Sequence, residues 1–334
     1  MYHRKKFNLI LAIIFNVGLL VFFKYYNSFI SCFASLVAAP FSGHVAGGLI
    51  PDLVIPLGIS FFTFRAISYQ VDVYRLKIKP HNDFLSFLIY FTFFPLIIAG
   101  PIARYHDLQS QLPGRKAGLG FFIEGIEMFA GGLVKKVLIG DTFASIADMV
   151  FQSPVSDIST LIAWVGILSF TLQVFFDFSG YTDMALGIGR MLGFRYPQNF
   201  NYPYFSKNIH EFWQRWHITL STWLRDYLFL PLAFSLSRKL RKNQYAAIPA
   251  DFIIYFISVI LTFFICGFWH GAGVKFIIWG LYFAFFLIIE QVGLRRVIRK
   301  AWSPFQHLYT LLVVVCSWVI FRSRDLEFAH AFLV

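Results

Sequence analysis

The chain has 334 residues, of which 58% are hydrophobic and only 14% are charged, whereas soluble domains carry about 25% charged residues. Aromatic residues make up 20% of the chain, a composition typical of lipid-facing helices and of the aromatic belts at membrane surfaces. These figures exclude a soluble enzyme with a single anchor, a disordered chain and a disulfide scaffold. A membrane β-barrel is excluded as well, because its strands alternate apolar and polar residues and the apolar runs here are continuous.

Apolar runs follow one another along the whole chain. A membrane-crossing helix needs about 20 mostly apolar residues, and no long linker, internal repeat or low-complexity tract divides the sequence. We therefore expect one all-α domain over residues 1–334, a polytopic bundle of about eight to ten transmembrane spans. The expected spans are 7–23, 49–69, 84–99, 119–139, 161–176, 223–236, 252–269, 274–289 and 308–321, with 28–40 as a short or interfacial tenth.

Basic residues gather in short clusters and indicate part of the topology. The chain holds 29 Lys and Arg against 17 Asp and Glu, a net charge of +12, and short cytoplasmic loops attract such clusters. The first two clusters bracket two spans, which places an outside turn near 43–48. No soluble face collects the charges, so nucleic acid is not an expected partner. The clusters lie at 3–6, 75–79, 238–242 and 295–300.

The stretch 252–289 lies between the last two clusters. It has 38 residues, about twice one bilayer crossing. This length predicts a helical hairpin, broken at the glycine cluster 267–273, which contains His270. His270 would then lie away from the cytoplasmic ends, near the outer side or in a cavity open to it.

The segment 175–232 is rich in charged and amide side chains, although it lies among apolar spans. A charged side chain at membrane depth costs about 2.5–3.5 kcal/mol on insertion scales, so it is retained where it lines a cavity, pairs or takes part in chemistry. The segment predicts a polar chamber or an interfacial shelf with aromatic walls. Asp177 and Asp183 could form a carboxylate pair there, but nearby glycine and proline residues favour Asp177 as the anchor of a helix break.

Two of the nine histidines have unusual neighbours. His217 follows the tryptophan-rich run 213–216, and His270 lies in the Gly-Phe-Trp-His-Gly run 267–271. A neutral imidazole can take a proton from a hydroxyl and return it near neutral pH, so both are candidate acid–base residues. The structural alternative for each is a histidine hydrogen-bonded at a helix end or placed beside tryptophan at the interface. His210 and His217 are seven residues apart, but without a third ligand they predict no metal site.

Short motifs throughout most of the chain occur in the order typical of one family. The sequence resembles the membrane-bound O-acyltransferase (MBOAT) family, and within it the bacterial branch of alginate O-acetyltransferase membrane subunits. The motifs are FKYYN (23–27), PLGISFFTF (56–64), DVYR (72–75), FP (94–95), AGPIAR (99–104), GLVKK (132–136), DFSGYTD (177–183), FWQRWH (212–217), WLRDY (223–227) and GFWHG (267–271).

This resemblance implies an acyl-transfer enzyme whose many helices surround a central tunnel or funnel. The histidine matching His270 is the proposed catalytic residue of the family, and the one matching His217 is a second functional histidine. His270 would deprotonate an acceptor hydroxyl that attacks a cytoplasmic acyl thioester, acetyl-CoA or a related donor, with no tightly bound cofactor or metal. His217, Arg215 or a nearby hydroxyl would stabilise the oxyanion. The expected tunnel-lining residues are Asp177, Arg215, Trp216, Arg225, Asp226 and Trp269.

The resemblance also implies a multi-pass protein of the bacterial cytoplasmic (inner) membrane. It would move an acyl group, acetyl first, toward hydroxyls of an extracytoplasmic polysaccharide such as alginate, together with a periplasmic or secreted acetyltransferase partner. Members of the family usually extend further at both ends, so we expect a truncated or short form. The residues after Pro231 and Leu232 differ from the glycine-rich turn of alginate-type members, which leaves another exopolysaccharide or a cell-wall polymer open as the acceptor.

Three other functions stay open from the sequence. The first is a D-alanyl transferase that acts on teichoic acid and takes its acyl group from a carrier protein. The second is a transporter or scaffold whose polar chamber holds a ligand without chemistry. The third is an inactive remnant of a longer enzyme.

Overall fold

The computed structural model describes residues 2–38, 53–80, 83–112, 118–240, 242–246 and 248–333, so the outside turn expected near 43–48 lies outside the described residues. The helices are α1 (Tyr2–Ala38), α2 (Ile59–Tyr74), α3 (Phe84–Thr92), α4 (Tyr105–Gln109), α5 (Leu119–Val134), α6 (Asp141–Gln152), α7 (Thr160–Met191), α8 (Ile209–Arg215), α9 (Ile218–Leu224), α10 (Leu230–Lys239), α11 (Ala250–His270), α12 (Val274–Ile289), α13 (Arg295–Lys300), α14 (Ser303–Arg322) and α15 (Leu326–Leu333). Short 3₁₀ turns lie at Phe94–Leu96, Val155–Asp157 and Pro203–Phe205, and π-helical turns at Lys135–Gly140, Arg225–Phe229 and Glu290–Leu294. The described strands are β1 (Gln244–Tyr245) and β2 (Ile248–Pro249), an antiparallel pair.

The all-α prediction is confirmed, but fewer described helices are long and apolar enough to cross a membrane than the eight to ten spans expected. The run 84–99 does not form one helix, because α3 ends just before Pro95. The run 223–236 lies in a continuous helical stretch, but a π-helical turn there carries Arg225 and Asp226, and the stretch is not among the described helices apolar enough to cross. The five helices that meet both criteria are Arg4–Phe33, Thr160–Met191, Ala250–His270, Val274–Lys300 and Ser303–Arg322.

The chain divides into two compact units, Met1–Ile98 with Arg104–His106, and Ala99–Ala103 with Asp107–Val334. In the first unit, a buried arginine of α2, Arg65, donates to the carbonyl oxygens of Phe91 (3.2 Å) and Leu96 (2.8 Å). These carbonyls lie at and just beyond the end of α3, where the last C=O groups of a helix lack partners within it. Arg65 therefore fastens α2 to the end of α3.

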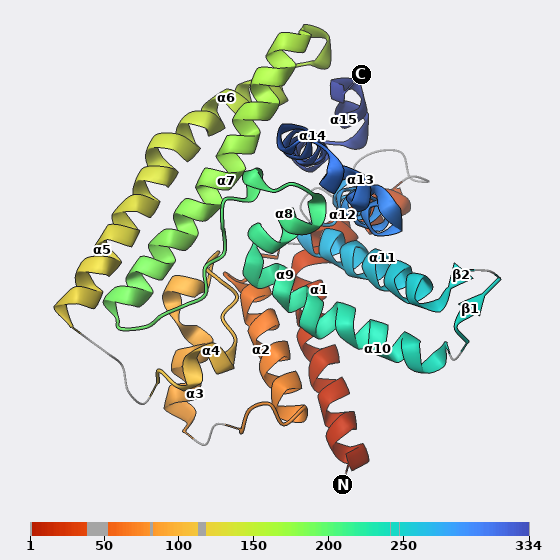
Figure 1. Cartoon of the computed structure of the whole chain (residues 1–334). Helices are drawn as coiled ribbons and strands as arrows, with labels where there is room; N and C mark the ends of the chain where they lie inside the picture. Colours follow the sequence, from red (N-terminus) through yellow and green to blue (C-terminus); the bar gives the residue numbers. More distant parts are fainter. Residues whose placement is uncertain are drawn as a thin grey trace. The chain divides into compact units, whose positions relative to one another are not determined.

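In the second unit, α5 and α7 run side by side in opposite directions (Figure 1). Glycines meet across this helix pair. A Cβ atom at Gly132 would lie 2.5 Å from the carbonyl oxygen of Gly180, and one at Gly125 would lie 2.7 Å from that of Gly187. Small residues of this kind let the backbones of membrane helices approach closely.

Replacing Gly132 by alanine should destabilise the protein, because the new methyl group would collide with the backbone of α7 and overpacking costs about 1–3 kcal/mol. Gly120 is the matched control, since it lies in the same helix and a Cβ atom there meets nothing within 4 Å. The Gly120→Ala variant should be neutral or slightly more stable, because alanine favours helix. Thermal unfolding in detergent measures both variants, and equal Tm values would contradict the close approach.

The helix α7 is continuous from Thr160 to Met191, so the predicted helix break at Asp177 is wrong. The Asp177 carboxylate forms an ion pair with Lys136 (2.8 Å) instead, and Asp183 pairs with Lys135 (2.6 Å). Positions six residues apart lie on different faces of a helix, and each carboxylate has its own lysine. The interpretation of Asp177 and Asp183 as a carboxylate pair is therefore wrong too.

The predicted hairpin of α11 and α12 is confirmed (Figure 1). The first arm ends at His270 and the second begins at Val274, so the break falls within the predicted glycine cluster. Further along the arms, a Cβ atom at Gly280 would overlap the carbonyl oxygen of Phe263 on the facing helix. The hairpin places His270 at its closed end.

Candidate active site

His217 lies at the sharp turn between α8 and α9. Its backbone is left-handed, with φ 42° and ψ 54°, a conformation that costs a non-glycine residue about 1–3 kcal/mol and persists only where the surroundings impose it. The Ile218 N–H donates to the Asn199 carbonyl (2.9 Å) and holds the turn in place. The side chain of His217 is buried, with 4% of the residue exposed. Strain of this kind gathers at functional sites.

Buried hydrogen bonds determine which nitrogen of His217 carries the proton. The Thr219 N–H donates to the Asn199 side chain at Oδ1 (3.2 Å), which must be the amide oxygen because an N–H group needs an acceptor. His217 Nδ1 lies 3.0 Å from the same oxygen and therefore donates to it, so Nε2 is left as an acceptor. The hydroxyl of Thr219 also bonds this oxygen (2.9 Å) and accepts from the Ile102 N–H (3.0 Å).

Burial lowers the pKa of His217 from its ordinary 6.5 to about 3, with a smaller contribution from the charge of His270. The imidazole is therefore neutral at physiological pH. The ring of Phe178 contacts it edge-on, with the two centroids 4.7 Å apart, and shields one side. His217 thus presents a neutral proton acceptor in surroundings from which water is largely excluded.

His270 is half-buried among aromatic rings at the closed end of the hairpin. Its ring centroid lies 4.6 Å from that of Trp269, 4.9 Å from that of Trp279 and 5.2 Å from that of Phe321. The three rings come from α11, α12 and α14. They exclude water from part of the imidazole and leave the rest accessible to a reactant.

A chain of packed tryptophans connects the surroundings of the two histidines, although they are far apart in the sequence. Trp216, the neighbour of His217, packs on Trp318 with centroids 5.0 Å apart. Trp318 in turn stacks on Trp279 at 6.2 Å, and Trp279 contacts His270. The effect of His270 on the pKa of His217 agrees with this arrangement. We call the rings of Trp216, Trp269, Trp279, Trp318 and Phe321 the aromatic wall.

The other predicted site residues fall into two groups in the structure. Trp216 and Trp269 belong to the aromatic wall, whereas the four charged residues lie in ion pairs. A tunnel-lining role for the charged residues stays a prediction, since each carries a partner within the protein. The pairs are Arg215–Glu211 (2.8 Å), Arg225–Asp226 (2.7 Å) and Asp177–Lys136 (2.8 Å).

Sequence reasoning missed Asn199 and the tryptophans Trp279 and Trp318. Asn199 lies in the polar segment 175–232, but nothing in the spacing relates it to His217, 18 residues further along. In the sequence, nothing distinguishes the two tryptophans from ordinary residues of apolar helices. Only their contacts across α8, α12 and α14 show that they enclose the site.

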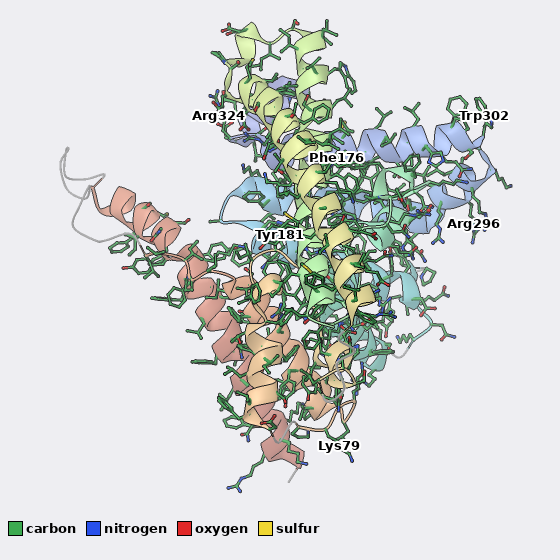
Figure 2. The ribbon with its side chains drawn as sticks, turned by 90° about the vertical axis from the view of Figure 1, so that its left-hand side faces the viewer. Lys79, Phe176, Tyr181, Arg296, Trp302 and Arg324 are labelled. Atoms are coloured by element: carbon green, nitrogen blue, oxygen red, sulfur yellow. The ribbon has the colours of Figure 1, made fainter. Side chains whose placement is uncertain are left out.

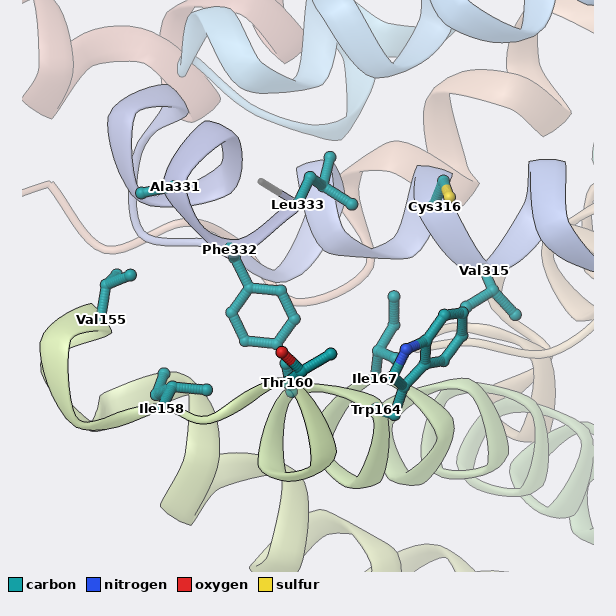
Figure 3. A pocket seen from close by; sticks show the side chains of 11 residues that line it. Val155, Ile158, Thr160, Trp164, Ile167, Val315, Cys316, Ala331, Phe332 and Leu333 are labelled. Atoms are coloured by element: carbon teal, nitrogen blue, oxygen red, sulfur yellow. The ribbon is translucent and has the colours of Figure 1, made fainter.

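A cavity of about 330 Å³ lies elsewhere in this unit, between the start of α7 and the helices α14 and α15 (Figure 3). Trp164 and Phe332 project into it, and the thiol of Cys316 is the one ionisable group on its lining. Neither histidine lines it. It offers no acid–base pair, so it does not compete with the histidines as a site for proton transfer.

A family comparison agrees with this geometry. The sequence profile of the membrane-bound O-acyltransferase family matches residues 57–323, which include both histidines and the whole aromatic wall. The chain belongs to the membrane-bound O-acyltransferase family. Both candidate histidines of this MBOAT chain therefore lie within the part that matches the family.

Several curated relatives of this MBOAT chain are similar over most of its length. A probable alginate O-acetylase of Pseudomonas aeruginosa is 38% identical over 96% of this chain and 58% of its own length. The peptidoglycan O-acetyltransferase of Helicobacter pylori is 36% identical over 97% of this chain and 63% of its own length. The teichoic acid D-alanyltransferase of Bacillus subtilis is 29% identical over 80% of this chain and 67% of its own length. The chain spans less than two thirds of the first two relatives.

Proposed function

We propose that this chain is a membrane O-acyltransferase that transfers an acyl group, acetyl in the first instance, to hydroxyls of a polysaccharide outside the bacterial cytoplasmic membrane. The observation that carries the proposal is the convergence of His217 and His270 on one aromatic-walled site. The probable alginate O-acetylase of P. aeruginosa and the peptidoglycan O-acetyltransferase of H. pylori match 96% and 97% of the chain, whereas the D-alanyltransferase of B. subtilis matches 80% at lower identity. This difference supports acetyl over D-alanyl.

In this proposal His270 is the general base. Its imidazole takes the proton of an acceptor hydroxyl, and the hydroxyl oxygen attacks the carbonyl carbon of an acyl thioester. The C–S bond then breaks, and the imidazolium returns its proton to the departing thiolate. The thioester, acetyl-CoA or a related donor, is a substrate that arrives from the cytoplasm.

His217 has a different part in the same step. Its Nδ1–H is engaged by Asn199, and its Nε2 atom is an acceptor. A neutral acceptor cannot stabilise an oxyanion, and Arg215 is held by Glu211. We therefore infer that His217 orients the acceptor hydroxyl toward the thioester, which leaves the stabilisation of the oxyanion to other donors.

The hairpin supports a route for the acyl group. His270 lies at the closed end, and the basic clusters 238–242 and 295–300, which we place in the cytoplasm, lie at the opposite end. The acyl group would therefore leave toward the outer side, where a periplasmic or secreted acetyltransferase partner would complete its transfer to the polysaccharide.

The test uses a strain that lacks the gene and carries either the wild-type gene or an empty vector. Mild base releases ester-linked groups from the surface polymers, and acetate and D-alanine are then measured separately. We expect acetate to be restored by the wild-type gene alone. Restoration of D-alanine would favour the second candidate, a D-alanyl transferase for teichoic acid. Restoration of neither ester would favour a transporter, a scaffold or an inactive remnant.

A further inference from the structure

A second cavity, of about 410 Å³, opens beside the cytoplasmic ends assigned to α12 and α13. Residues of α8 and its preceding turn, of the π-helical turn after α12, of α13 and of α14 form its lining. Neither His217 nor His270 is among them. The charged residues of the lining are Lys207, Glu211, Glu290, Arg295, Arg296 and Arg299.

The two carboxylates of this lining are engaged elsewhere. Glu211 forms an ion pair with Arg215 at 2.8 Å. Glu290 is buried, with 3% exposed, and accepts hydrogen bonds from the backbone N–H groups of Ile209 (2.7 Å) and His210 (3.1 Å) at the start of α8. Both acids bind the frame around α8, and the lining still holds four cations against these two carboxylates, of which Glu290 is close enough to Arg295 to feel its charge.

The four cations of the lining are Lys207, Arg295, Arg296 and Arg299. Over the described ranges of the chain, no carboxylate lies within ion-pair distance of Lys207, Arg295, Arg296 or Arg299. Like charges gathered around one hollow attract an anion from solution. Three of the four are guanidinium groups, whose planar donors match the oxygens of a phosphate.

The position of the cavity restricts what can reach it. Figure 2 shows Arg296 and Trp302 at one end of α14 and Arg324 at the other. Trp302 is 71% exposed, as is typical of tryptophan at a membrane–water interface. We therefore place the mouth of the cavity at the membrane surface, which both lipid phosphates and water-soluble ligands can reach. The helix α8, whose first turn borders it, leads directly to the turn that holds His217.

We propose that this basic cavity binds the phosphate groups of an anionic ligand, and that its connection through α8 favours the phosphates of the acyl donor over those of a lipid. The phosphate site stands on the charges of the cavity, whereas the choice of donor rests on the proposed function. A donor held here by its phosphates could extend its thioester end along α8 toward the histidines.

Binding of coenzyme A to the purified full chain in phosphatidylcholine nanodiscs tests whether the cavity holds the phosphates of the acyl donor. The double variant Arg295→Gln with Arg299→Gln should bind at least tenfold more weakly, because it loses two charge-assisted hydrogen-bonding groups. Lys300→Gln is the matched control, since it removes one charge from the same helix outside the cavity. It should bind coenzyme A as the wild type does. Arg296→Gln provides a second variant if the double variant does not fold.

A second experiment tests whether the cavity holds a lipid phosphate instead. It uses phosphatidylglycerol nanodiscs and measures how much of this lipid stays bound to the protein on extraction. Unchanged coenzyme A affinity with reduced lipid retention in the double variant would assign the phosphate to a lipid. If the double variant changed neither the affinity for coenzyme A nor the retention of the lipid, the proposal would be overturned. Binding needs no turnover, so loss of acyl transfer with binding intact contradicts only the proposed function. An unaltered KM for acetyl-CoA in the double variant contradicts only the donor assignment.

Discussion

Replacing His270 by alanine should lower acyl transfer by at least about 10²-fold, the smaller end of what a positioned general base contributes. In cells, the surface polysaccharide should lose its ester-linked acetate. His217 cannot replace the missing base, because Asn199 holds its ring at the turn between α8 and α9. Acetate released by mild base, compared at equal amounts of protein in the membrane, measures the effect.

His330→Ala is the matched control, because His330 is an exposed histidine of α15 outside the aromatic wall. This variant should retain the acetate of the wild type. Wild-type acetate from His270→Ala would remove His270 as the base. An equal loss of acetate in both variants would show that the loss has a cause outside the site.

Replacing Asn199 by aspartate should introduce an acidic limb into the pH dependence of acyl transfer. In the wild type, burial lowers the pKa of His217 to about 3, so Nε2 stays unprotonated over the working range. A carboxylate in place of the amide still accepts from Nδ1, but its negative charge favours the imidazolium and raises the pKa of His217. As the pH falls, Nε2 becomes protonated and can no longer accept a hydrogen bond.

The measurement is kcat between about pH 5 and 8, the range in which a histidine ordinarily titrates. The Asn199→Asp variant should approach wild-type activity at the alkaline end and lose it progressively toward the acidic end. Asn201→Asp makes the same chemical change at an exposed position two residues away and should leave the profile unchanged. A loss in Asn199→Asp that is equal at every pH would indicate structural damage and contradict the role of Asn199 in positioning His217.

The hairpin that carries His270 shows what local rules can predict. Its length alone requires two crossings, and the glycine cluster 267–273 marks the break. The number of spans was overestimated for the opposite reason. An apolar run does not reveal whether one helix continues through it, and the run 84–99 breaks at Pro95. The helical run around 223–236 carries Arg225 and Asp226 and is not among the described helices apolar enough to cross.

The misinterpretation of Asp177 and Asp183 has a similar cause. Both carboxylates are neutralised by lysines of a different helix segment, Lys136 and Lys135. Their sequence spacing carries no information about these partners. The partners of Glu290 cannot be predicted from the sequence for the same reason, since its carboxylate binds the start of α8, which is about 80 residues away along the chain.

The sequence by itself determined the class of the molecule, because composition and apolar run length report directly on the membrane environment. It also singled out His217 and His270, since an imidazole beside tryptophan and glycine stands out from an apolar helix. The tertiary structure decided the rest: the tautomer of His217, the aromatic wall that extends from His270 to Trp216 and the cavity with an excess of basic residues. These properties depend on which atoms meet through space, and most of those contacts join residues far apart in the sequence.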